Sequence, residues 1–74
     1  MNNEIKKLVD QLHNNNRFIF EYSEAISCSI RSVVSHHLQG KYNIPEKYQI
    51  TAYNVAKRLL DEQNRIINEI KVNL

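Results

Sequence analysis

The sequence predicts an all-α protein: a small helical hairpin of three helices that self-associates. Its only glycine and only proline, Gly40 and Pro45, lie five residues apart. Apolar residues recur at helical spacing on both sides of this pair. Because glycine and proline are the strongest local signals of a turn, we expect two long antiparallel helices joined at Gly40–Pro45 and preceded by a short one. At 74 residues the chain forms a single small helical domain, 1–74.

The first helix is short. Its apolar positions, Ile5, Leu8, Val9 and Leu12, follow the i, i+3, i+4, i+7 pattern of one helical face. Asn2 or Asn3 is suited to cap its start. The run Asn14–Asn16 then predicts a break or a kink, since asparagine competes for backbone hydrogen bonds. A helix that continues through these residues is the alternative.

The second predicted helix runs from about Arg17 to Gln39. Phe18 and Phe20 cannot both face one core, so we expect one of them to be an exposed anchor. The apolar arc is wider than in most helices, which indicates contact with more than one neighbour. The main stripe consists of Ile19, Tyr22, Ile26, Ile30 and Val33.

The third predicted helix runs from Pro45 towards Leu74. Asn43-Ile-Pro-Glu46 has the pattern of a capping box, with a side-chain acceptor, a proline and then a glutamate. A seam of the coiled-coil type follows, in which Gln63 is the one polar member. The seam consists of Ala52, Ala56, Leu59, Gln63, Ile66 and Ile70.

The length of this helix predicts a homo-oligomer. From residue 45 to 72 it would extend about 42 Å, whereas a compact chain of this size is roughly 30 Å across. One end would therefore overhang, and it carries the apolar residues Ile66, Ile67 and Ile70. A second copy of the chain is the simplest cover for them, most simply as a two-fold dimer.

The region of the turn is basic. Between Arg31 and Arg58 the sequence has five basic residues and one acid, although the net charge is only +2. Basic side chains and histidine bind phosphate, and tyrosine rings stack on bases. We therefore expect a site for an anionic partner, either a phosphate-bearing, nucleotide-type ligand or nucleic acid. The candidate ligand-binding residues are Arg31, His36, His37, Lys41, Tyr42, Lys47 and Tyr48.

An equally weighted alternative is a protein–protein interaction module, such as an inhibitor or adaptor of a host protein. The abundance of Asn, Ile and Lys is typical of AT-rich genomes and suits a phage or mobile element. Under this hypothesis the working surface is apolar. The candidate interface residues are Phe18, Phe20, Tyr22, Ile66, Ile67 and Ile70.

Other classes of function are disfavoured by the sequence. Cys28 is the only cysteine, so no disulfide forms within the chain. The adjacent histidines His36 and His37 point in different directions on a helix, so we expect no metal or other cofactor. No glycine-rich loop or activated nucleophile predicts an enzyme. Without an apolar run of membrane-spanning length or a secretory signal, we expect a cytoplasmic protein.

Overall fold

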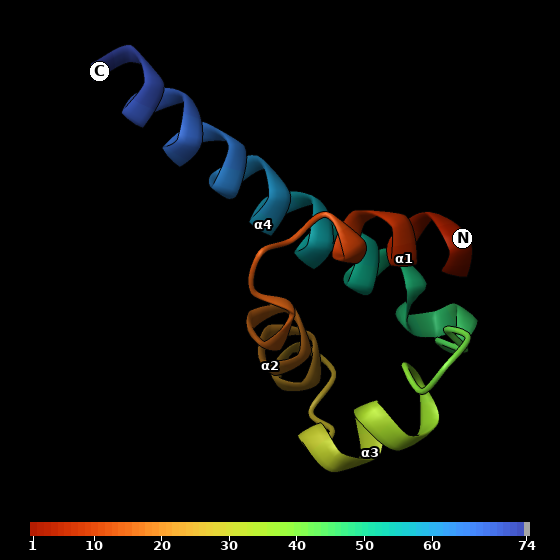
Figure 1. Cartoon of the computed structure of the whole chain (residues 1–74). Helices are drawn as coiled ribbons and strands as arrows, with labels where there is room; N and C mark the ends of the chain where they lie inside the picture. Colours follow the sequence, from red (N-terminus) through yellow and green to blue (C-terminus); the bar gives the residue numbers. More distant parts are fainter. Residues whose placement is uncertain (74) are drawn as a thin grey trace.

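The computed structural model describes residues 1–73 and consists of four helices joined by short loops (Figure 1). The described residues contain no strand, so the all-α class is confirmed. α1 and α2 pack against the first half of α4, and α3 packs against α2. The helices are α1 (Asn2–Asp10), α2 (Asn15–Ala25), α3 (Ile30–His36) and α4 (Glu46–Asn73).

The asparagine run separates α1 from α2, as the sequence predicts. The Asn14 side-chain oxygen accepts a hydrogen bond from the backbone N–H of Arg17 at 3.4 Å. Asn14 therefore caps the start of α2 and satisfies one of its free donors. The chain changes direction at this cap, and α1 and α2 each pack against α4.

The prediction of one long helix from 17 to 39 is wrong, and with it the hairpin of two long helices. α2 ends at Ala25, where Ser27 adopts a left-handed conformation with φ of 57°. The N–H of Ser27 donates to the carbonyl of Glu24 at 3.2 Å, and that of Cys28 to Ser23 at 3.0 Å. This is the Schellman arrangement that closes many helices. The Ser29 hydroxyl then accepts from the Ser32 N–H and begins α3.

The predicted caps of two other helices are also wrong. α4 begins at Glu46, and no side-chain hydrogen bond of Asn43 is present in residues 1–73. The Asn2 side chain does not cap α1. Instead, its oxygen accepts from the N–H of Ile44 at 2.8 Å and its nitrogen donates to the Ile44 carbonyl at 3.4 Å. Asn2 therefore fastens the loop before α4 to the start of α1.

The core lies where α1, α2 and α4 meet. The rings of Phe18 and Tyr22 stack with centroids 5.7 Å apart. The small side chains of Ala52 and Ala56 form the facing surface of α4, which lets neighbouring helices approach closely. The buried apolar residues are Ile5, Val9, Leu12, Phe18, Tyr22, Val33, Ile44, Ala52, Ala56, Leu59 and Leu60.

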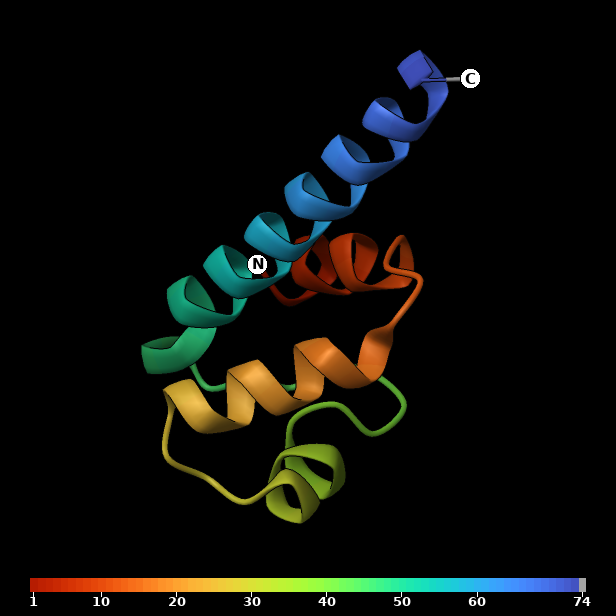
Figure 2. The ribbon, with the colours of Figure 1, turned by 90° about the vertical axis from the view of Figure 1, so that its left-hand side faces the viewer.

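The C-terminal part of α4 projects beyond the other helices, as the sequence predicts (Figure 2). The helix has 28 residues, or about 42 Å of length, and the molecule measures 43 × 21 × 20 Å. We call residues 66–73 the arm. On it Ile66 and Ile70 are 46% and 55% exposed. None of the helices in residues 1–73 is both long and apolar enough to cross a membrane.

Candidate functional site

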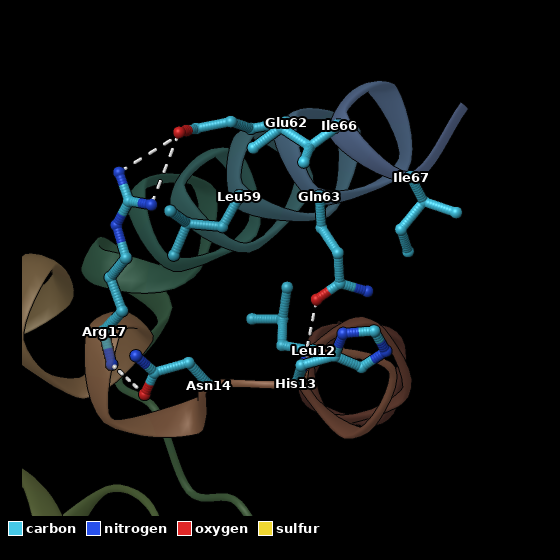
Figure 3. Close-up of a pocket in the computed structure, with 9 residues that line it drawn as sticks. All are labelled: Leu12, His13, Asn14, Arg17, Leu59, Glu62, Gln63, Ile66 and Ile67. Atoms are coloured by element: carbon cyan, nitrogen blue, oxygen red, sulfur yellow. Dashed lines mark hydrogen bonds and ion pairs between the residues drawn. The ribbon is translucent and has the colours of Figure 1, made fainter. Parts of the chain in front are cut away.

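A groove of about 230 Å³ lies where the arm leaves the rest of the molecule (Figure 3). The turn between α1 and α2 forms one wall, and α4 forms the floor. Four of its residues are apolar, Leu12, Leu59, Ile66 and Ile67, and the last two also belong to the arm. The remaining lining residues are polar: His13, Asn14, Arg17, Glu62 and Gln63.

Gln63 holds the end of α1 against the floor of the groove. Its side-chain oxygen accepts from the backbone N–H of His13 at 2.8 Å, and its nitrogen donates to the carbonyl of Gln11 at 3.0 Å. Both backbone groups lie beyond the last turn of α1, where no helical partner is available. The polar residue of the predicted seam thus joins the end of α1 to α4 by hydrogen bonds.

Ion pairs fix α2 on the other side of the groove. Arg17 contacts Glu62 at 3.3 Å and Glu21 at 3.0 Å, and Arg58 also pairs with Glu21. The hydrogen bond from Arg58 lowers the pKa of Glu21, and the charge of Glu62 raises the pKa of Arg17. These pairs join α2 to α4 and orient the Arg17 side chain beside the groove.

A second cluster lies at the other end of the molecule, where α3 leads towards α4. The Tyr22 hydroxyl lies 2.9 Å from Nδ1 of His37. The rings of His37 and Tyr48 are 6.2 Å apart, and Lys47 Nζ lies 5.0 Å from the Tyr48 ring centre. Burial raises the pKa of Tyr22. Burial, together with the charge of His36, lowers the pKa of His37.

The structure brings together only some of the seven candidate ligand-binding residues. His37, Lys47 and Tyr48 lie side by side, but both rings are half-buried and take part in packing. Tyr42 instead packs near α1, where Lys6 Nζ lies 5.9 Å from the Tyr42 ring centre. Burial raises the pKa of the Tyr42 hydroxyl. The other three candidates are exposed, as is Lys47: Arg31, His36 and Lys41.

Of the six candidate interface residues, some are buried in the core and others are on the surface. Phe18 and Tyr22 are fully buried in the core of the chain, so they are not available on its surface. Phe20 is 55% exposed, which confirms that one of the two phenylalanines faces outward. Ile66 and Ile70 are exposed on the arm, and Ile67 lines the groove.

Three residues that line the groove were not predicted as a site: Leu12, Arg17 and Glu62. Leu12 continues the apolar spacing of α1 just beyond its end, and nothing in this spacing indicates that it borders a groove. Arg17 and Glu62 are 45 positions apart in the sequence, so no local spacing predicts that they pair.

No family model, curated protein or solved structure matches the chain.

Proposed function

We propose that the chain is a non-enzymatic binding protein that docks an amphipathic helix of another polypeptide on the arm and its groove. The observation that carries this proposal is the exposure of Ile66 and Ile70 next to a groove with an apolar floor. Binding of a helix in an apolar groove is a recurrent mode of recognition, with anchors spaced three or four residues apart. Ile66, Ile67 and Ile70 have this spacing.

The arm is suited to this role because its shape does not depend on the partner. It continues a helix whose first half is fixed in the core by Ala52, Ala56, Leu59 and Leu60. Its apolar side chains are therefore already arranged for binding, which reduces the entropy lost on association. Ile66 and Ile70 are each about half exposed, so covering both contributes roughly 1.5–3 kcal/mol in total, to which contact with the apolar floor of the groove adds.

The test compares aspartate substitutions at the two ends of α4. Ile66→Asp and Ile70→Asp change the arm, and Ile50→Asp changes an isoleucine near the start of the helix that is 63% exposed. With the tagged protein as bait, we expect polypeptides retained by the wild type to be lost with either arm variant and kept with Ile50→Asp. Equal retention by all four proteins would refute the proposal.

An anionic partner along α3, the loop after it and the start of α4 is the second candidate function. It is favoured by unpaired charge: within residues 1–73, Arg31, Lys41 and Lys47 form no ion pair. By contrast, Arg17 forms an ion pair with Glu62, and Arg58 forms one with Glu21. Cations without a local partner are free to bind phosphate groups.

This second candidate predicts binding that weakens steeply with salt, because phosphate contacts release counterions. A fluorescent single-stranded oligonucleotide serves as the probe. We expect the double variant Arg31→Ala/Lys41→Ala to bind more weakly than Lys57→Ala/Arg65→Ala, which removes the same charge elsewhere. Binding that is insensitive to salt, or equal loss in the two double variants, would exclude this function.

A further inference from the structure

We propose that the helix docked on the arm is the arm of a second copy of this chain, in an antiparallel, two-fold dimer. Ile70 of each copy then enters the groove of the other. This inference rests on the proposed function and names the partner of the same site. It gives the groove and the protruding isoleucines complementary roles, because a two-fold contact pairs the same surface of both copies.

The direction of the two arms follows from the position of the other helices. Leu59, Gln63, Ile66 and Ile70 recur at steps of three or four, so they share one face of α4. The first half of this face carries α1 and α2. Parallel arms would bring both sets of helices to the same end and make them collide. Antiparallel arms place them at opposite ends.

The register follows from the groove. If Ile66 lies on the two-fold axis, Ile70 of the second copy lies level with Glu62. Glu62 lines the groove together with Leu59 and Leu12. In this register one exposed isoleucine fills the groove and the other packs against its own counterpart. Both are then removed from water.

The charges beside the groove are complementary in this arrangement. Glu62 and Glu69 lie two turns apart on one flank of α4, and Arg17 is bound to Glu62 on that flank. Figure 3 shows Arg17 and the end of α1 on opposite sides of the groove. In an antiparallel two-fold pair like flanks face each other, so Glu69 of the second copy approaches Arg17.

The opposite flank is also matched in charge. Lys71 of the second copy approaches the C-terminal end of α1, where the helix dipole is negative. Neither Glu69 nor Lys71 has an ion-pair partner in the described part of its own chain. The dimer therefore supplies partners to both.

The contact is small, so the dimer is weak. The overlap from residue 62 to 70 extends only about 14 Å at the rise of an α-helix. It buries less than the roughly 1,600 Å² of a standard interface, so we expect a concentration-dependent equilibrium rather than a permanent dimer.

Sedimentation equilibrium of the purified protein tests this proposal, over about 1–500 µM as suits a small interface. We expect wild-type protein to dimerise and Ile70→Asp to raise the dissociation constant about tenfold or more. The control Ile50→Asp should leave it unchanged. Glu69→Arg should weaken the dimer, and more so at low salt, because it places a cation next to Arg17.

Disulfide trapping tests the register. In a Cys28→Ser background, Ile66→Cys places a thiol on the two-fold axis, and Asn68→Cys places one two residues further along, away from the apolar face. Mild oxidation should cross-link Ile66→Cys much faster than Asn68→Cys. Equal cross-linking of the two variants overturns the proposed arrangement.

The two proposals fail in different ways. A wild-type protein that stays monomeric across the whole range overturns the dimer. If such a monomer retains another polypeptide through Ile66 and Ile70, the docking function stands and only its partner changes. If the monomer also retains polypeptides equally well without these residues, both proposals fall.

Discussion

The hydroxyl of Tyr22 lies 2.9 Å from Nδ1 of His37 and joins α2 to the end of α3. Tyr22 is fully buried, so its hydroxyl has no access to water as an alternative partner. Among the helices of residues 1–73, α3 packs closely only against α2. This hydrogen bond is therefore one of few polar contacts that fix the position of α3.

Acid should destabilise the protein through His37. Burial lowers its pKa in the folded state below the value of about 6.5 for an exposed histidine. The unfolded chain then binds more protons than the folded one, so stability falls as the pH drops below about 6.5. The groups that face His37 are Tyr22, Tyr48 and His36, with Lys47 nearby. None of them is an acid that would stabilise its charge.

The measurement is urea unfolding at pH 7.5 and at pH 5.5. We expect the loss of stability on acidification to be smaller in His37→Gln than in the wild type. The exposed neighbour provides the control, since His36→Gln should retain most of the loss. If both variants respond to acid as the wild type does, His37 is not the group responsible.

Removal of the Tyr22 hydroxyl should destabilise the protein by about 1 kcal/mol. Tyr22→Phe keeps the ring that stacks on Phe18 but leaves Nδ1 of His37 without its partner. Tyr53→Phe is the matched control, because Tyr53 makes no side-chain hydrogen bond in residues 1–73 and is half-buried. The free energies of unfolding of both variants and the wild type are measured in urea. If Tyr22→Phe is as stable as the wild type, the hydrogen bond makes no net contribution to stability.

The ion pairs of Glu21 should contribute a modest stability that depends on salt. Glu21→Gln removes one partner from both Arg17 and Arg58, yet these side chains are half-exposed. We therefore expect a loss of less than about 1 kcal/mol at low salt and a smaller one at high salt. Glu24→Gln is the control, since Glu24 is exposed and has no ion pair within the described residues. A larger loss at high salt would contradict this account.

The sequence predicts the buried faces only in part, since Ile30 of the predicted stripe is 47% exposed, and it does not show what covers each face. Ile5, Val9, Phe18 and Tyr22 all lie on apolar stripes, and all are buried. The same pattern supported Phe18 and Tyr22 as interface residues, because periodicity does not distinguish a core from a contact with another molecule. The overhang of α4 was predictable, since it follows from helix length alone.

The groove could not be predicted, because it depends on the direction of the chain at Asn14. A run of asparagines indicates a break but not the angle between the helices it separates. Leu12 and Ile66 border the same groove because of the angle between α1 and α2, which no local sequence pattern predicts. Among the basic residues predicted to bind an anion, Arg31, Lys41 and Lys47 are exposed, but their spacing did not indicate which of them lie together.

The end of α2 was missed because it lacks the usual glycine. Helices that end in a Schellman arrangement most often have glycine at the left-handed position, and here it is Ser27. The available signal was the cap of the next helix, in which Ser29 stands three residues before Ser32. A serine-rich stretch offers several such positions, so this signal is weak without a glycine or proline beside it.

Ser27→Gly should therefore stabilise the protein. Glycine adopts a positive φ without the steric strain of a side chain, and Ser27 has a φ of 57° and makes no side-chain hydrogen bond in residues 1–73. The relief of strain exceeds the added entropy of the unfolded chain, so we expect a gain of about 0.5–1 kcal/mol.

The control substitution has the opposite expected sign. Ser35→Gly introduces the same residue at an exposed position inside α3, where glycine costs about 0.5–1 kcal/mol. Ser27→Ala should give little change, because the alanine side chain keeps the strain at φ of 57°. Urea unfolding of the three variants separates the backbone effect from the loss of a hydroxyl. If Ser27→Gly is destabilised like Ser35→Gly, residues 26–29 form a continuous helix rather than the break between α2 and α3.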